Sequence, residues 1–218
     1  MEIIDAPTSG SRRKNAEQLI RDGYEFRFGE YLNTAIAILK KEPLMFFGYS
    51  IIASILSSIP FLAYPAYAGF FVVADKIRKG EPYSFDDFFG GFRDRFGALL
   101  LASIVSVIFI MLGLVLCILP GIYLAIGYAF VIPFILFYTG DFWIAMELSR
   151  KLISKNWLIV FAFILVAGFL SSLGILLCFI GIFLTFPVFY LSVYAAYEDI
   201  VGTGPEVTSV KNESETGF

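Results

Sequence analysis

Charge is missing from three long stretches of this sequence, and no other feature restricts its fold so strongly. No Asp, Glu, Lys or Arg occurs in residues 43–74, 96–140 or 156–197, which are 32, 45 and 42 residues long. A helix needs about 20 apolar residues to cross a bilayer, so the second and third stretches are each two spans long. The first holds two spans if its second helix continues through the basic residues at 76–79, whose side chains extend into the headgroups. The sequence therefore predicts an all-α, polytopic membrane protein with six transmembrane helices.

Composition supports this class and sets the ends of the membrane domain. Hydrophobic residues make up 58% of the chain and charged residues 16%, whereas a soluble domain carries about 25% charged residues. Residues 1–25 lack the apolar core of a signal peptide and are expected to form a polar arm. Residues 201–218 have the composition of a disordered tail. A single membrane domain is expected over residues 26–200.

Each uncharged stretch has to reverse direction near its middle. Backbone inside a bilayer must satisfy its own hydrogen bonds, so the spans are helical and each reversal belongs at the membrane surface. Proline lacks an N–H and glycine tolerates unusual backbone angles. We therefore predict hairpin turns at Pro60, at Pro120–Gly121 and at Gly181. In the second stretch this places spans over about residues 97–119 and 121–140.

The distribution of charge predicts the orientation. All 16 Lys and Arg residues lie outside the three hairpin tips, and cytoplasmic loops are the ones enriched in positive charge. Both termini and both linkers between hairpins are thus expected on the cytoplasmic side. All 19 acidic residues fall on the same side.

A short amphipathic segment precedes each hairpin. The three segments begin at Phe28, Phe85 and Phe142, at intervals of 57 residues. In the second segment five phenylalanines recur at helical spacing over residues 85–96, and Ser84 is well placed as an N-cap. Helices of this kind lie in the membrane interface with their charged face toward water. We expect one cytoplasmic interfacial helix before each hairpin.

Hairpins and interfacial helices together predict a threefold internal repeat. The repeats would span about residues 26–80, 81–140 and 141–200, each starting and ending in the cytoplasm. Such parallel repeats are related by an axis along the membrane normal. The alternative is that membrane helices resemble each other by composition alone.

Prolines and small residues recur inside the predicted spans. The second helix of each hairpin holds a proline that is expected to kink it or free a carbonyl, either for architecture or for function: these are Pro65, Pro133 and Pro187. The first helix holds small residues four apart, which allow close helix packing: these are Ser50, Ser54 and Ser58, then Ala98, Ala102 and Ser106, then Gly168 and Ser172.

The residues that usually carry chemistry are scarce. The chain has no histidine, which excludes imidazole metal sites and histidine acid–base catalysis. No ionisable side chain is expected in the spans, which argues against a pump or ion-coupled transporter. Cys117 and Cys178 each precede a turn by three residues and either pair or pack as small apolar residues. We assign no catalytic, cofactor or metal residue, and the net charge of −3 gives no reason to expect a nucleic-acid partner.

Tyrosines are the remaining candidate binding residues. Tyr123, Tyr128 and Tyr190 lie in the predicted second helices and are candidates to line an apolar pocket for a lipid or quinone. The alternative is that they pack between helices or anchor the protein at the interface.

Several segments resemble a broad group of bacterial integral membrane proteins. The resemblance covers about residues 26–200 and is carried by "LPGIYLAIGYAFVIPFILF", by "FWIAMELSRKLISKNW" and by "PVFYLSVYAAYEDI". The group includes the membrane domain found beside some glycerophosphodiester phosphodiesterases. The resemblance implies a six-helix, multi-pass protein of the bacterial cytoplasmic (inner) membrane. It implies no activity, because this chain lacks a phosphodiesterase catalytic domain.

Two classes of function remain. The first is a non-enzymatic scaffold or accessory subunit of an inner-membrane complex, or a factor in membrane or envelope homeostasis, with membrane lipids around it and a protein partner in the membrane. The second is a binder or carrier of a lipid or other apolar small molecule. A scaffold needs a packed centre and an exposed apolar flank, whereas a carrier needs a cavity between the repeats. A membrane-embedded enzyme is disfavoured because no catalytic constellation is present.

Overall fold

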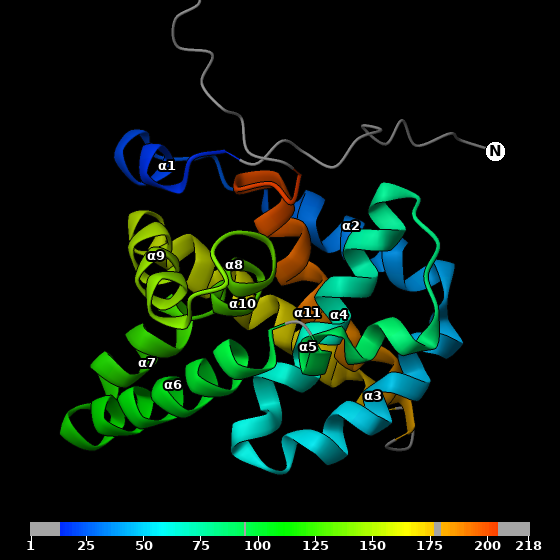
Figure 1. Ribbon diagram of the computed structural model, residues 1–218. Coiled ribbons are helices and arrows are strands. Elements are labelled where there is room, and N and C mark those ends of the chain that lie inside the picture. Colours follow the sequence, from blue (N-terminus) through cyan, green and yellow to red (C-terminus); the bar gives the residue numbers. More distant parts are fainter. Residues whose placement is uncertain (1–13, 94, 177–179, 205–218) are drawn as a thin grey trace, which may run out of the picture.

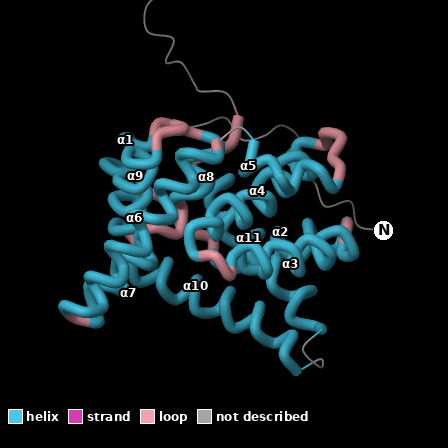
Figure 2. Tube along the Cα trace, turned by 60° about the horizontal axis from the view of Figure 1, so that its bottom comes forward, coloured by secondary structure: helices cyan, strands magenta, loops and turns pink. Residues whose placement is uncertain are grey.

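The structure is a computed structural model that describes residues 14–93, 95–176 and 180–204. These residues form helices and connecting loops without any strand (Figures 1 and 2), so the prediction of an all-α fold is confirmed for them. The α-helices are α1 (Ala16–Asp22), α2 (Phe28–Lys41), α3 (Pro43–Ser57), α4 (Ala63–Lys79), α5 (Gly90–Arg93), α6 (Phe96–Leu116), α7 (Ile118–Gly127), α8 (Val131–Phe137), α9 (Phe142–Lys155), α10 (Trp157–Ser172) and α11 (Ile180–Ile200). The 3-10 helices are η1 (Pro60–Leu62), η2 (Phe85–Phe89) and η3 (Leu173–Leu176).

Within the described residues, three helical segments are long and apolar enough to cross a membrane. They are α6, the α7–α8 pair taken together over Ile118–Phe137, and Gly181–Ile200 of α11. A fourth is added if α9 and α10 count as one broken span, although they meet at an angle of 102°. Helix α3 is apolar but only 15 residues long.

Local sequence signals set several helix ends. Helices begin at Phe28, Phe85 and Phe142, where the amphipathic segments begin. The predicted N-cap at Ser84 is confirmed: its side chain and that of Asp87 form a capping box, with the Ser84 N–H donating to Asp87 Oδ2 at 2.8 Å. Asp141 is the N-cap of α9, and its side-chain Oδ1 accepts from the N–H of Ile144 at 2.9 Å.

The second hairpin reverses three residues earlier than predicted. Helix α6 ends at Leu116, Cys117 is extended (φ −167°, ψ 137°), and Pro120–Gly121 lie in the first turn of α7. Proline is tolerated there because the first N–H groups of a helix have no acceptor within it. Gly113 and Gly121 allow a close approach of the two helices. A Cβ atom on Gly113 would lie 2.9 Å from the Gly121 Cα and N atoms, and a Cβ atom on Gly121 would lie 2.7 Å from the Leu114 N atom.

The other two turns lie close to their predicted residues. Pro60 begins η1, the short link between α3 and α4. Gly181 is the second residue of α11, and a Cβ atom on Gly174 in η3 would overlap the Gly181 carbonyl. The third hairpin thus also brings two glycine backbones together. Cys178 lies outside the described residues, whereas Cys117 is a free, exposed thiol.

Two of the three prolines of the second helices are the third residue of a helix, in its first turn. Pro65 is the third residue of α4, so the expectation of a kink there is wrong, because a missing N–H in the first turn breaks no helical bond. Pro133 follows a break between α7 and α8 by one turn. Pro187 lies inside α11.

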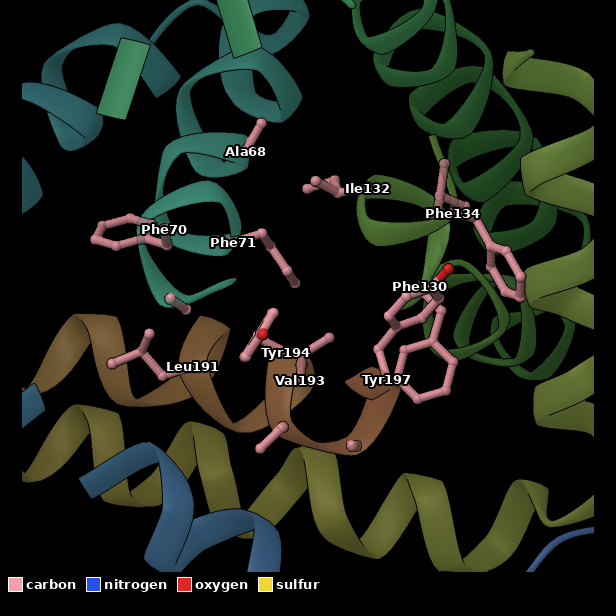
Figure 3. Close-up of a cluster of buried hydrophobic side chains, with 14 of the residues drawn as sticks. Ala68, Phe70, Phe71, Phe130, Ile132, Phe134, Leu191, Val193, Tyr194 and Tyr197 are labelled. Carbon is pink, nitrogen blue, oxygen red and sulfur yellow. The ribbon is translucent and has the colours of Figure 1, made fainter. Parts of the chain in front are cut away.

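Helix α11 forms the centre of the molecule and packs against α2, α3, α4 and α10. Leu191, Tyr194 and Tyr197 are fully buried, and Figure 3 shows them facing aromatic side chains of α4 and of the α7–α8 region. The Tyr197 ring makes an edge contact with Phe134 at 5.1 Å between centroids. The core is filled by rings, each of which buries a large apolar area.

The second amphipathic segment packs on α4 and α3. Phe88 of η2 is fully buried and stacks on Tyr49 of α3, with ring centroids 4.3 Å apart. The Tyr49 hydroxyl donates to the Ala66 carbonyl of α4. A Cβ atom on Gly69 would overlap the Phe88 carbonyl, so the absence of a side chain there lets η2 lie directly on α4.

The predicted polar arm over residues 1–25 contains an ordered helix in its described part. Helix α1 packs against α9, and its first residue, Ala16, is fully buried. The backbone N–H of Lys14 donates to the Val201 carbonyl just after α11, at 2.7 Å. The start of the predicted tail is also packed, since Val201 is fully buried. This segment ties α9 to the end of α11.

Candidate functional site

The most unusual feature inside a candidate span is the break between α7 and α8. Residues 128–130 separate Gly127, the last residue of α7, from Val131, the first of α8. Pro133 has no N–H to donate to the carbonyl four residues before it, at Ala129. Two backbone groups next to the break, the Gly127 carbonyl and the Phe130 N–H, are bonded to another helix.

That helix is α9, which runs alongside the break. The fully buried Ser149 donates through Oγ to the Gly127 carbonyl at 2.6 Å and accepts from the Phe130 N–H at 3.1 Å. A single hydroxyl therefore satisfies one acceptor and one donor. In an apolar environment an unsatisfied backbone group is costly, so α9 is needed where the span is broken.

A second contact holds α9 to α7 one helical turn further on. The Tyr123 hydroxyl and Ser154 Oγ lie 2.5 Å apart, and Ser154 Oγ also donates to the Arg150 carbonyl at 2.6 Å. The Tyr123 ring stacks over Trp157, at the start of α10. These contacts fix the side of α9 that faces α7.

Between these contacts and α6 lies a cavity of about 340 Å³, which we call the α7–α9 cavity. Its lining combines aromatic, aliphatic and charged side chains: Phe109, Tyr123, Leu124, Tyr128, Trp143, Met146, Glu147 and Arg150. Pockets of about 300–1,000 Å³ lined mainly by apolar groups with a few polar ones are typical of small-molecule sites.

The charged side chains of this cavity are already paired. Glu147 accepts from Arg150 at 3.0 Å and lies 3.0 Å from Lys151 Nζ. Hydrogen bonds from Arg150 and Lys151 lower the pKa of Glu147 below its usual value. Because 36–51% of each of these side chains is exposed, each pair contributes only about 0.3–0.5 kcal/mol. The pairs are thus easily rearranged by a ligand with charges of its own.

A second cavity lies on the other side of Tyr128. This α4–α11 cavity has a volume of about 200 Å³ and is lined by Tyr64, Tyr67, Phe71, Ala125, Tyr128, Ala129, Ile132, Ile164, Phe189, Tyr190 and Val193. Tyr190 stacks on Tyr67 with centroids 4.4 Å apart. A third cavity of about 250 Å³ lies between α10 and α11 and also includes Tyr190.

The three predicted pocket tyrosines therefore lie in neighbouring cavities. Of these three cavities, Tyr123 lines the α7–α9 cavity and Tyr190 lines the other two. Tyr128 lies in the helix break and lines both the α7–α9 and the α4–α11 cavities.

Sequence reasoning missed a buried network of charges between α4 and α11. Asp75 and Glu198 are only 8% and 7% exposed. Asp75 pairs with Lys79 at 2.7 Å and accepts from the Tyr194 hydroxyl at 3.1 Å. Glu198 accepts from Arg78 Nε at 2.9 Å. Each carboxylate is the first charged residue after an uncharged stretch, and that position is the signal that points to it.

Both carboxylates in this network have a partner of opposite sign, Lys79 for Asp75 and Arg78 for Glu198. Buried charges in proteins are normally paired in this way. Among the residues that the structure describes, no group of three or more His, Cys, Asp or Glu side chains is arranged to hold a metal ion.

Comparisons with protein-family models, with curated proteins and with solved structures found no match to this chain. The resemblance to the membrane domain beside glycerophosphodiester phosphodiesterases stays a prediction.

Proposed function

We propose that this chain is a non-enzymatic integral membrane protein that acts as a scaffold or accessory subunit, holding a protein partner in the membrane. It would cross the cytoplasmic (inner) membrane of a bacterium six times, with both termini in the cytoplasm. Its place would be in an inner-membrane complex or in membrane and envelope homeostasis.

The order of helices supports six spans. Each of the three uncharged stretches contains two apolar helical segments separated by a short break, and each is preceded by an amphipathic helix. Helix α10 has 16 residues, which gives a length of about 24 Å. The hydrocarbon core is about 30 Å thick, and flanking residues and local thinning of the bilayer make up such a difference.

The observation that carries the proposal is the projecting α6–α7 hairpin. In Figure 1 it extends to the lower left, away from α11 and the packed centre. Its tip is strongly exposed, with Val115 at 84% and Leu119 at 74%, and the exposed apolar side chains continue along α6 through Met111 and Leu112. A packed centre with an exposed apolar flank is the arrangement expected of a scaffold, and an apolar patch of this kind contacts either lipid or another protein.

A photo-crosslinking amino acid tests this proposal in intact membranes. Placed at Met111 or Val115 of α6, which are 57% and 84% exposed, it should give one discrete protein adduct. Leu165 and Phe169 of α10 are similarly exposed, at 56% and 66%, and serve as matched positions that should give lipid adducts only. A discrete protein adduct from α10 but none from α6 would contradict the assignment of the hairpin as the docking element.

A second candidate function is binding of a lipid or another apolar small molecule. It is favoured by the α7–α9 cavity, which places aromatic walls next to two charged side chains, Glu147 and Arg150. Such a combination suits an amphiphile, whose polar and apolar parts need different surroundings. Mass spectrometry of gently extracted protein, without unfolding, tests this candidate, because a bound amphiphile appears as a discrete mass increment.

A further inference from the structure

The polar end of the α7–α9 cavity presents one charge of each sign. Glu147 and Arg150 are three residues apart on α9, and both line the cavity. Residues three apart lie on the same face of a helix. The cavity therefore offers an anion site beside the guanidinium and a cation site beside the carboxylate.

Its walls favour a cation next to Glu147. Four aromatic side chains line the cavity, namely Phe109 of α6, Tyr123 of α7, Tyr128 of the helix break and Trp143 of α9. An ammonium group within about 6 Å of such ring faces is attracted by their quadrupole, most strongly by that of tryptophan. Trp143 lies on the same face of α9 as Glu147, because Trp143 precedes Glu147 by four residues.

An apolar surface continues from the cavity along the hairpin. Phe109 lines the cavity, and Leu112 and Leu116 follow it on the same face of α6 at helical spacing. These two leucines are 54% and 83% exposed. On α7, Leu119 precedes the cavity residue Tyr123 by one turn and is 74% exposed. A ligand with its polar part in the cavity thus has room for long hydrocarbon chains toward the hairpin tip.

We propose that the α7–α9 cavity binds the headgroup of a zwitterionic phospholipid, with the phosphate beside Arg150 and the ammonium group beside Glu147 and the aromatic walls. This inference rests on the second candidate function above and adds the class of ligand and its contacts. A zwitterion exchanges the Glu147–Arg150 pair for two new pairs and adds no net charge. An anionic lipid would take Arg150 from Glu147 and bring no cation to replace it, so the carboxylate would keep only its contact with Lys151.

Lipid binding to the full chain in detergent, followed by native mass spectrometry, tests the contacts. Phosphatidylethanolamine and phosphatidylglycerol with identical acyl chains are compared on the wild type, Arg150→Gln and Glu147→Gln. Loss of one charge-assisted contact should weaken phosphatidylethanolamine binding about tenfold or more. The control is Arg93→Gln, because Arg93 is 59% exposed, pairs with Asp86 at 3.2 Å and lies outside the cavity.

The expected result is a preference of the wild type and Arg93→Gln for phosphatidylethanolamine that both cavity variants lose. Equal binding of the two lipids by the wild type, or unchanged binding by both cavity variants, overturns this inference while leaving lipid binding itself intact. Retention of no lipid at all by the wild type overturns the second candidate function.

Fluorescence gives a measurement that does not depend on the charge variants folding. The chain has two tryptophans, so Trp157→Phe leaves Trp143 in the cavity as the sole reporter. Phosphatidylethanolamine brominated on its acyl chains should quench Trp143 at a lower mole fraction than brominated phosphatidylglycerol. Soluble phosphoethanolamine should compete only at far higher concentration, and competition as tight as that of the lipid would overturn the assignment of a phospholipid as ligand.

Discussion

Replacing Ser149 with alanine tests the hydrogen-bonding role that the structure gives to α9. The substitution removes the hydroxyl that donates to the Gly127 carbonyl at 2.6 Å and accepts from the Phe130 N–H at 3.1 Å. Both bonds are buried. The backbone at the α7–α8 break would then keep a donor and an acceptor without this partner.

The size of the effect follows from these two bonds. An interhelical hydrogen bond in a membrane protein contributes about 0.6 kcal/mol on average. A buried group left without its partner costs about 1–3 kcal/mol, and Ser149→Ala leaves two. We expect the free energy of unfolding to fall by about 2–3 kcal/mol, toward the lower end of that sum because the break can relax.

Unfolding in mixed micelles by titration with sodium dodecyl sulfate, followed by circular dichroism, measures this change. The matched control is Ser50→Ala, which removes an equally buried hydroxyl that donates only within its own helix, to the Phe46 carbonyl at 2.8 Å. The control should lose at most about 0.6 kcal/mol. Equal losses for the two variants would refute the idea that Ser149 supports a broken span.

Three further predictions test the hairpin, its orientation and the interfacial segment. Gly113→Ala should destabilise the protein by about 1–3 kcal/mol, because the new Cβ would lie 2.9 Å from the Gly121 backbone. The control is Gly97→Ala at the start of the same helix, where a new Cβ meets no atom within 4 Å. Equal shifts of the melting temperature in the two variants would contradict the close packing of the hairpin. In the Cys178→Ser variant, a membrane-impermeant maleimide should label the exposed Cys117 in intact cells. A cysteine introduced as Glu81→Cys in a Cys-free background should react only after the cells are permeabilised. The reverse labelling pattern would show that the topology is opposite to the one predicted. Partial burial raises the pKa of Asp87, but hydrogen bonds from Lys76 and from the Ser84 backbone lower it more, to below its usual 3.8. A carboxyl group whose pKa is depressed in the folded state stabilises the protein above about pH 4, and this contribution is lost as pH falls through the folded-state pKa. As pH falls below about 4, the unfolding midpoint should therefore change less in Asp87→Asn than in the wild type.

Features set by neighbouring residues were predictable from the sequence. The capping box at Ser84 and Asp87 needs only residues three apart, and helices begin at Phe28, Phe85 and Phe142, as the amphipathic pattern indicates. Helix formation was predictable because backbone groups in an apolar stretch have few other ways to be satisfied.

Features that join distant residues were not predictable. Pro120–Gly121 reads as a turn locally, but the glycine is needed for the approach to Gly113 across the hairpin. Asp75 and Glu198 come together in one network from α4 and α11, and nothing in either segment alone specifies the other. Tyr123, Tyr128 and Tyr190 are similar in sequence context, yet the packing of α9 and α11 divides them between cavities.

The helix break constrains how the α7–α9 cavity behaves. Because Ser149 bonds both sides of the break, moving α9 away would leave two backbone groups without a partner in an apolar environment, at several kcal/mol. The hydrogen bond between Tyr123 and Ser154 adds a second attachment on the same helix face. The wall that α7 and α9 form is therefore a fixed feature of the fold, because separating these two helices would require both attachments to break. A fixed wall on this side favours retention of a bound lipid over its passage between α7 and α9. A phospholipid bound between α7 and α9 would then stabilise the base of the α6–α7 hairpin, the element proposed above to contact the protein partner.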